Sequence, residues 1–176
     1  MPRKSAGLLL FRQRAGGLEI LLVHPGGPFW AKKEEGAWSI PKGEVDEGEE
    51  PLAAAKREVA EELGVAPDGH FIPLAPVRQP GGKIVQAWAI EADIDPAAIT
   101  SNTFQMEWPP RSGRQQTFPE VDRAAWFTIS AARAKISRGQ LPLLDALIRA
   151  HTRDQSAVQL GANRAVRPPS NARWGR

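Results

Sequence analysis

Residues 43–65 read GEVDEGEEPLAAAKREVAEELGV, and this stretch predicts the helix around which the fold is organised. Glu49 and Glu50 place negative charge at the start, Pro51 suits the first helical position, and Gly64 stands where a helix commonly ends. Apolar residues recur at helical spacing and form one stripe: Leu52, Ala55, Val59 and Leu63. The stretch therefore predicts an amphipathic helix whose stripe faces the core.

Three glutamates lie on another face of this helix. Glu58, Glu61 and Glu62 are related by i, i+3 and i+4 spacings, so their side chains lie close together. Like charges at these spacings destabilise a helix unless a positive group intervenes, and Mg²⁺ prefers oxygen ligands and bridges to substrate phosphates. The pattern alone is also typical of a solvated acidic face, so the neighbouring residues must distinguish the two interpretations.

From Gly43 to Val65 the sequence resembles the Nudix box, G-x5-E-x7-R-E-U-x-E-E-x-G-U with U aliphatic, at every specified position. The resemblance implies a Nudix fold and a divalent metal cofactor, Mg²⁺ with Mn²⁺ as a substitute. It also implies that Glu58, Glu61 and Glu62 bind this metal directly or through water.

The other box residues have physical roles in keeping with the resemblance. Gly43 permits a backbone turn in which the carbonyl of Lys42 can point at the metal. Arg57 lies two helical turns after Glu49, so it can pair with an acid and orient the metal-binding carboxylates. A helix-capping ion pair between Glu49 and Arg57 is the purely structural alternative, and it is compatible with that role.

Nudix enzymes usually recruit a further glutamate from a distant loop, and this chain has two candidates. Glu120 lies six residues before Trp126, a placement that resembles the loop glutamate of the nucleoside-triphosphate-hydrolysing members. We predict Glu120 as a metal ligand and general base, with Glu107 as the second candidate and Glu61 acting alone as the third. The implied reaction is attack of a metal-activated water on a phosphorus of a diphosphate linkage.

Residues 38–43 (WSIPKG) resemble the family members that act on dinucleoside polyphosphates and related compounds. Two markers disagree with this: the chain has no tyrosine, and Pro80 lies where ADP-ribose hydrolases often carry a proline, although it also begins a Pro-Gly-Gly turn. A nucleoside triphosphate or dinucleoside polyphosphate is the favoured substrate. The alternatives are ADP-ribose or another nucleotide sugar, an RNA 5′ end or cap, and a non-enzymatic nucleotide or RNA sensor.

No G-x-x-x-x-G-K-[ST] motif is present, so substrate phosphates must contact metal and side chains instead. Trp108, in a polar stretch rich in proline, is a candidate for a lid or for stacking on a base. Basic candidates for phosphate binding, each also explicable as a solvated surface charge, are Lys42, Arg78, Lys83, Arg111 and Arg114.

The remaining elements predict an α+β protein, an α/β/α sandwich with a mixed central sheet. One domain over residues 1–160 and a basic, disordered tail over 161–176 are expected. The predicted strands cover residues 5–12, 18–24, 38–40, 71–77, 83–94 and 124–127, the later helices cover 130–137 and 141–151, and long loops cover 25–36 and 100–119.

The formal net charge of +3, from 23 Lys and Arg against 20 Asp and Glu, conceals an uneven distribution. Residues 44–62 hold eight acids against two bases, so a sequence pI near 9.6 does not indicate a nucleic-acid partner, and a small nucleotide is expected instead. The absence of cysteine excludes disulfides, cysteine-ligated zinc and thiol nucleophiles. No apolar stretch is long enough for a membrane span or signal peptide, so a cytoplasmic location is expected.

Overall fold

The first strand, β1, is the centre of a mixed seven-stranded sheet in the structure, a computed structural model that describes residues 3–165. It pairs parallel with β6 and antiparallel with β2 and β3, and the sheet order is β4–β6–β1–β2–β9, with β5 also paired to β6. The strands are β1 (Lys4–Arg14), β2 (Gly17–Pro25), β3 (Lys42–Glu44), β4 (Ile72–Pro73), β5 (Val77–Arg78), β6 (Ile84–Glu91) and β9 (Val121–Thr128).

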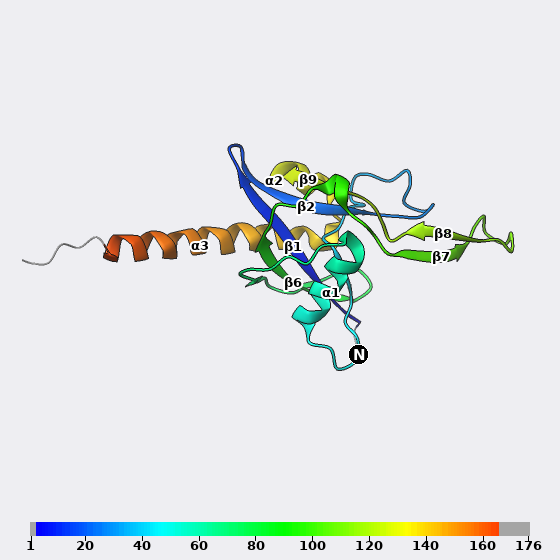
Figure 1. Cartoon of the computed structure of the whole chain (residues 1–176), viewed down its shortest axis with the longest axis horizontal. Helices are drawn as coiled ribbons and strands as arrows, with labels where there is room; N and C mark the ends of the chain where they lie inside the picture. Colours follow the sequence, from blue (N-terminus) through cyan, green and yellow to red (C-terminus); the bar gives the residue numbers. More distant parts are fainter. Residues whose placement is uncertain (1–2, 166–176) are drawn as a thin grey trace, which may run out of the picture.

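Helices cover both faces of the sheet because β1 is apolar on both sides. Leu8 and Leu10 pack with the helix α1 (Pro51–Leu63), whereas Leu9 and Phe11 belong to the core beneath α2 (Ile129–Lys135) and α3 (Leu141–Ala165). Figure 1 shows α1 on one side of the sheet and α3 on the other. The predicted α+β class with a mixed sheet is confirmed.

Residues 100–119 do not form the structureless loop that was predicted. A short 3₁₀ helix (Pro96–Ala98) precedes β7 (Thr103–Glu107), which pairs with β8 (Gln115–Pro119) in a separate two-stranded hairpin that projects from the body (Figure 1). Phe104 and Met106 are partly buried while their neighbours on β7 are exposed. This alternation marks a strand, but the many exposed polar residues of a projecting hairpin conceal it.

Other predicted strand boundaries were wrong. The run 71–77 is divided into β4 and β5, because Pro73 and Pro76 interrupt it. Residues 38–40 make only isolated bridges, Ser39 with Val23 and Trp38 with Ile136, and the strand β3 was not predicted.

The last helix is longer than predicted. It was expected to cover residues 141–151, but α3 extends to Ala165, well beyond Ile148, the last of the apolar residues that indicated the helix. Most of the predicted disordered tail, residues 166–176 of 161–176, lies outside the described part of the chain. Within the described residues, no helix has both the length and the apolar character needed to cross a bilayer.

Candidate functional site

The helix α1 has the end structures that its sequence predicts. The Glu50 side chain accepts a hydrogen bond from the Ala53 amide at 3.0 Å, and Pro51 occupies the first turn. Gly64 ends the helix in the left-handed conformation with φ of 70°, where its amide donates to the Ala60 carbonyl at 2.9 Å. Hydrogen bonds therefore cap α1 at both ends, which fixes where the helix begins and ends and which way its acidic face points.

Arg57 connects several groups of the site through hydrogen bonds. Its guanidinium donates two hydrogen bonds to Glu49, both at 2.9 Å, one to Glu58 at 2.8 Å and one to the Glu44 carbonyl at 3.0 Å. The bidentate pair, together with the Asp46 amide, lowers the pKa of Glu49 to about 2. Arg57 thus joins the loop before α1 to the carboxylates of α1.

Glu58 is buried against the backbone of β3. A side chain at Gly43 would overlap the Glu58 carboxylate, so any larger residue at this position of the box would displace that carboxylate. Burial raises the pKa of Glu58, although the hydrogen bond from Arg57 acts in the opposite direction. The close approach of Gly43 therefore explains a box residue for which the sequence suggested only a turn.

Glu62 lies beside Lys42, the first residue of β3. Its carboxylate accepts a hydrogen bond from the Lys42 amide at 3.1 Å. Burial raises its pKa to about 8, the charge of Lys42 opposes this, and the negative charges of Glu58 and Glu120 add to it. Burial also lowers the pKa of the Lys42 ammonium group. The nearby positive charge of Lys83 lowers this pKa further.

The structure brings Glu120 to these acids and leaves Glu107 elsewhere. The charge of Glu120 acts on both Glu58 and Glu62. Its amide donates to the Asn102 carbonyl at 2.8 Å, and the Asn102 amide donates to the Glu61 carbonyl at 2.8 Å, which connects Glu120 to α1 through one residue. Glu107 instead accepts from the Gly113 amide at 3.1 Å on the hairpin.

These carboxylates are suited to a hard divalent cation but are not gathered around one point. Among the described residues, no three acidic or histidine side chains converge closely enough to form a ready-made metal centre. Burial and the repulsion of neighbouring negative charges disfavour the charged forms of Glu58 and Glu62, and a cation with oxygen ligands would reverse that effect. The donor set therefore fits Mg²⁺ or Mn²⁺.

The predicted substrate-binding residues do not all lie together. Lys42 and Lys83 lie near the acids, and the Lys83 ammonium group is 3.7 Å from Glu44. Arg78 is exposed on β5. Trp108 and Arg111 lie at the outer end of the β7–β8 hairpin, where the Trp108 ring meets Phe29 edge to face at 5.4 Å between centroids.

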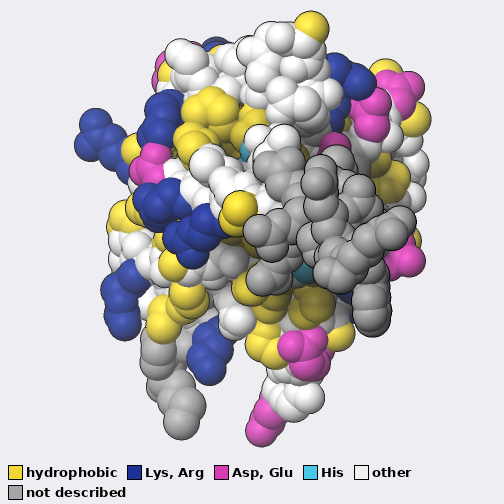
Figure 2. Space-filling model, turned by 90° about the vertical axis from the view of Figure 1, so that its left-hand side faces the viewer, with side chains coloured by type: hydrophobic (Ala, Val, Ile, Leu, Met, Phe, Trp, Pro, Cys, Tyr) yellow, Lys and Arg dark blue, Asp and Glu magenta, His cyan; other side chains and the backbone are white. Residues whose placement is uncertain are grey.

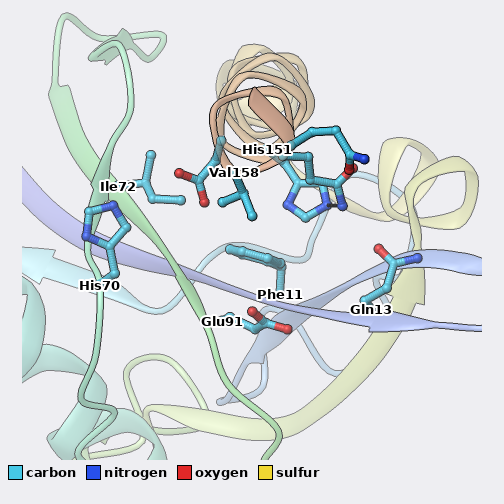
Figure 3. A pocket seen from close by; sticks show the side chains of 10 residues that line it. Phe11, Gln13, His70, Ile72, Glu91, His151 and Val158 are labelled. Atoms are coloured by element: carbon cyan, nitrogen blue, oxygen red, sulfur yellow. Dashed lines mark hydrogen bonds between the residues drawn. The ribbon is translucent and has the colours of Figure 1, made fainter. Parts of the chain in front are cut away.

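A hollow of about 780 Å³ lies on the opposite face of the sheet, between β1 and α3. In Figure 3, His151 and Val158 of α3 face Phe11 and Glu91 of the sheet, with His70 at the side. Figure 2, viewed from the side toward which α3 projects, shows Lys and Arg side chains along one edge of the surface in view. None of the predicted site residues lines the hollow.

A buried histidine that was not predicted from the sequence pairs with a carboxylate close to Glu120. His24 is fully buried, and its Nδ1 lies 2.8 Å from the Asp122 carboxylate while its Nε2 lies 2.6 Å from the Lys33 carbonyl. Asp122 follows Glu120 by two residues. The sequence offers one signal for this pair, which is that Asp122 lies two residues after the predicted loop glutamate, Glu120. His24 itself gives none, because its partner is 98 positions away in the sequence.

Comparisons with known proteins agree with this architecture. The family described as NUDIX domain matches residues 1–147. Over 65 residues the chain is 40% identical to the asymmetrical bis(5′-nucleosyl)-tetraphosphatase of Caenorhabditis elegans, covering 37% of this chain and 43% of that protein. Over 58 residues it is 40% identical to an RNA pyrophosphohydrolase of Caulobacter vibrioides, covering 30% and 34%. The chain thus spans less than half the length of these curated relatives.

Two solved structures share the fold. The NUDIX domain of Shewanella oneidensis NrtR complexed with ADP ribose has a TM-score of 0.59 at 18% identity, covering 85% of this chain and 88% of that one. A Caenorhabditis elegans Ap4A hydrolase binary complex has a TM-score of 0.55 at 22% identity, covering 89% and 98%. At these identities the likeness concerns the fold alone.

Proposed function

Because this chain belongs to the NUDIX domain family, we propose that it hydrolyses a phosphoric anhydride bond of a nucleoside polyphosphate with the help of Mg²⁺. The observation that carries the proposal is the group of partly buried carboxylates around Arg57. Glu58 and Glu62 have raised pKa values, and Glu120 reaches the same place from the far end of the chain. Carboxylates grouped in this way are suited to bind a divalent cation that also contacts the phosphates of a polyphosphate.

Glu58, Glu61, Glu62 and Glu120, with the Lys42 carbonyl, would hold the cation. When bound, Mg²⁺ or Mn²⁺ lowers the pKa of a coordinated water and neutralises charge on phosphate oxygens. Arg57 fixes the rotamer of Glu58 through its 2.8 Å hydrogen bond and is itself fixed by Glu49. Its role is to orient the carboxylates.

The chemistry requires a base and a receptor for phosphate charge. The water oxygen forms the new P–O bond, the bridging P–O bond breaks, and a glutamate takes the proton. Glu120 is our first choice for this base, and Glu61 is the alternative. Lys42 and Lys83, whose charges act on each other near the acids, are placed to bind the phosphates that leave with the product.

A dinucleoside polyphosphate is the substrate that we favour. The chain is 40% identical to a bis(5′-nucleosyl)-tetraphosphatase over 65 residues, and the hairpin offers a site for a second base. Trp108 lies five residues beyond Thr103, so at about 3.4 Å per residue it is roughly 17 Å from the hairpin base next to Glu120. Trp108 and Arg111 would then contact the distant nucleoside, with Arg78 on the polyphosphate.

A 5′-triphosphorylated RNA is the second candidate. The RNA pyrophosphohydrolase of Caulobacter vibrioides matches the chain at the same level of identity as the tetraphosphatase, and an RNA 5′ end also carries bases beyond its phosphates. ADP-ribose is less favoured, because the likeness to the domain complexed with ADP ribose concerns the fold alone.

One substrate panel tests the proposal. The purified chain is incubated with Mg²⁺ and, separately, dinucleoside tetraphosphate, nucleoside triphosphate, ADP-ribose or 5′-triphosphorylated RNA, and the products are identified by mass spectrometry. We expect a nucleotide and a phosphate-bearing remainder, with the dinucleoside substrate giving the highest kcat/KM, and no turnover in EDTA. Nucleotide binding without turnover of any substrate would indicate a sensor.

Replacing Trp108 by alanine tests the role of the hairpin. Stacking of a base on an aromatic ring is worth about 1–3 kcal/mol, so kcat/KM for the dinucleoside substrate should fall by about 5–150-fold. Steady-state kinetics with a nucleoside triphosphate, which lacks the second base, provide the control and should change little. An equal loss for both substrates would refute a distal base site.

A further inference from the structure

We infer that buried His24 and its partner Asp122 form a clasp that positions Glu120, so that both are positioning residues for the proposed hydrolysis. This inference rests on the proposed function of Glu120, but the geometry of the clasp is independent of it. His24 is the last residue but one of β2, and Asp122 lies in β9, two residues after Glu120.

The pairing of β2 with β9 changes at this point. His24 is opposite Arg123, but the next residue, Pro25, is opposite Val121, so Asp122 is the extra residue of a β-bulge. Bulges bend a strand and redirect its side chains, and they are common next to active sites. Here the bulge stands directly between the regular part of β9 and Glu120.

His24 holds the bulge from a fully buried position. The Lys33 carbonyl can only accept, so the Nε2 atom of His24 donates to it. The Nδ1 atom contacts the Asp122 carboxylate, which also lies 3.7 Å from the Arg123 guanidinium. The imidazole therefore joins β9 on one side to the 26–37 loop on the other. The edge of its ring meets Trp38 at 5.2 Å between centroids, so the ring is confined by packing as well.

The backbone on the other side of the bulge depends on the same geometry. The Gly26 amide donates to the Glu120 carbonyl at 2.9 Å, and the Glu120 amide donates to Asn102 at 2.8 Å. A side chain on Gly26 would overlap the Pro119 carbonyl, so the two segments are in close contact. The clasp and these two hydrogen bonds together determine where the Glu120 carboxylate lies.

Replacing Asp122 by alanine should release the bulge. A misplacement of about 1 Å can lower kcat by about 100-fold, so we expect a fall of about 10–100-fold in kcat with little change in KM. Asp122→Asn keeps an acceptor for His24 and should recover most of this loss. Asp93→Ala, which breaks the ion pairs with Arg12 and Arg14, is the matched control and should leave kcat unchanged.

A double-mutant cycle separates positioning from general destabilisation. If the clasp acts through Glu120, Asp122→Ala should change kcat by less than about twofold in a Glu120→Gln background. The same fold-loss in both backgrounds would overturn the inference. An unchanged kcat in Glu120→Gln alone would also overturn the inference about the clasp. That result would leave the proposed hydrolase function intact.

Amide hydrogen exchange measured by NMR provides a readout that needs no activity. In Asp122→Ala the Gly26 and Glu120 amides should exchange at least about 10-fold faster, while the Val23 amide, bonded to Ser39 at 2.9 Å, should not change. Unchanged exchange at Gly26 and Glu120 would overturn the clasp. Absence of hydrolysis in the unmodified chain would instead overturn the proposed function, and the exchange result would still decide the clasp.

Discussion

Glu62→Gln is expected to lower kcat by about 10²–10⁴-fold, because a metal ion at such a site supplies several kcal/mol. Glutamine keeps the size of the side chain and can still accept the Lys42 amide, so the fold should survive. Burial already disfavours the charged form of Glu62, whose pKa is raised to about 8. The variant without cation should therefore be no less stable than the original chain.

Thermal unfolding with and without Mn²⁺ complements the kinetics of this variant. A ligand that binds only the folded state raises its stability, so Mn²⁺ should raise the Tm of the original chain and have a smaller effect on Glu62→Gln. Glu47→Gln, in the same acidic segment but exposed, is the control and should behave like the original chain. Full turnover in Glu62→Gln would contradict the proposed metal site.

Gly43→Ala is expected to have the second large effect. The added methyl group would overlap the Glu58 carboxylate, and Gly43 cannot easily retreat because it pairs with Ala6 of β1. The carboxylate is the flexible end of the Glu58 side chain and can move aside at little cost in stability, but its displacement from Arg57 should lower kcat by about 100-fold or more.

Gly16→Ala is the matched control for this substitution. Gly16 lies in the turn between β1 and β2, where an added methyl group would meet nothing within 4 Å. Denaturant unfolding and kcat should therefore remain close to those of the original chain. Normal turnover in Gly43→Ala would show that Glu58 does not need its present position.

The helix and its carboxylates could be predicted because they depend on local rules. The spacing of Glu58, Glu61 and Glu62 places them on one helix face wherever the helix lies, and the separation of eight positions between Glu49 and Arg57 brings that pair within reach. The caps at Glu50 and Gly64 follow from the same local chemistry. The family resemblance added the expectation of a Nudix fold, and the fold confirms it.

Elements without a local signal could not be predicted. The β7–β8 hairpin carries too many exposed polar residues to read as strands, and the outer part of α3 lacks the apolar stripe that reveals a docked helix. The relation of Gly43 to Glu58 was also hidden, because it is a contact between β3 and α1.

The sequence by itself determined the acidic helix, its direction and the kind of ion that it suits, since each follows from residue types at fixed helical spacings. Only the tertiary structure decided that Glu120, and not Glu107, lies with those acids, and that His24 holds the strand next to it. The physical reason is that strand register and a β-bulge join residues about a hundred positions apart. Such pairings depend on the packing of the whole sheet, which no local spacing records.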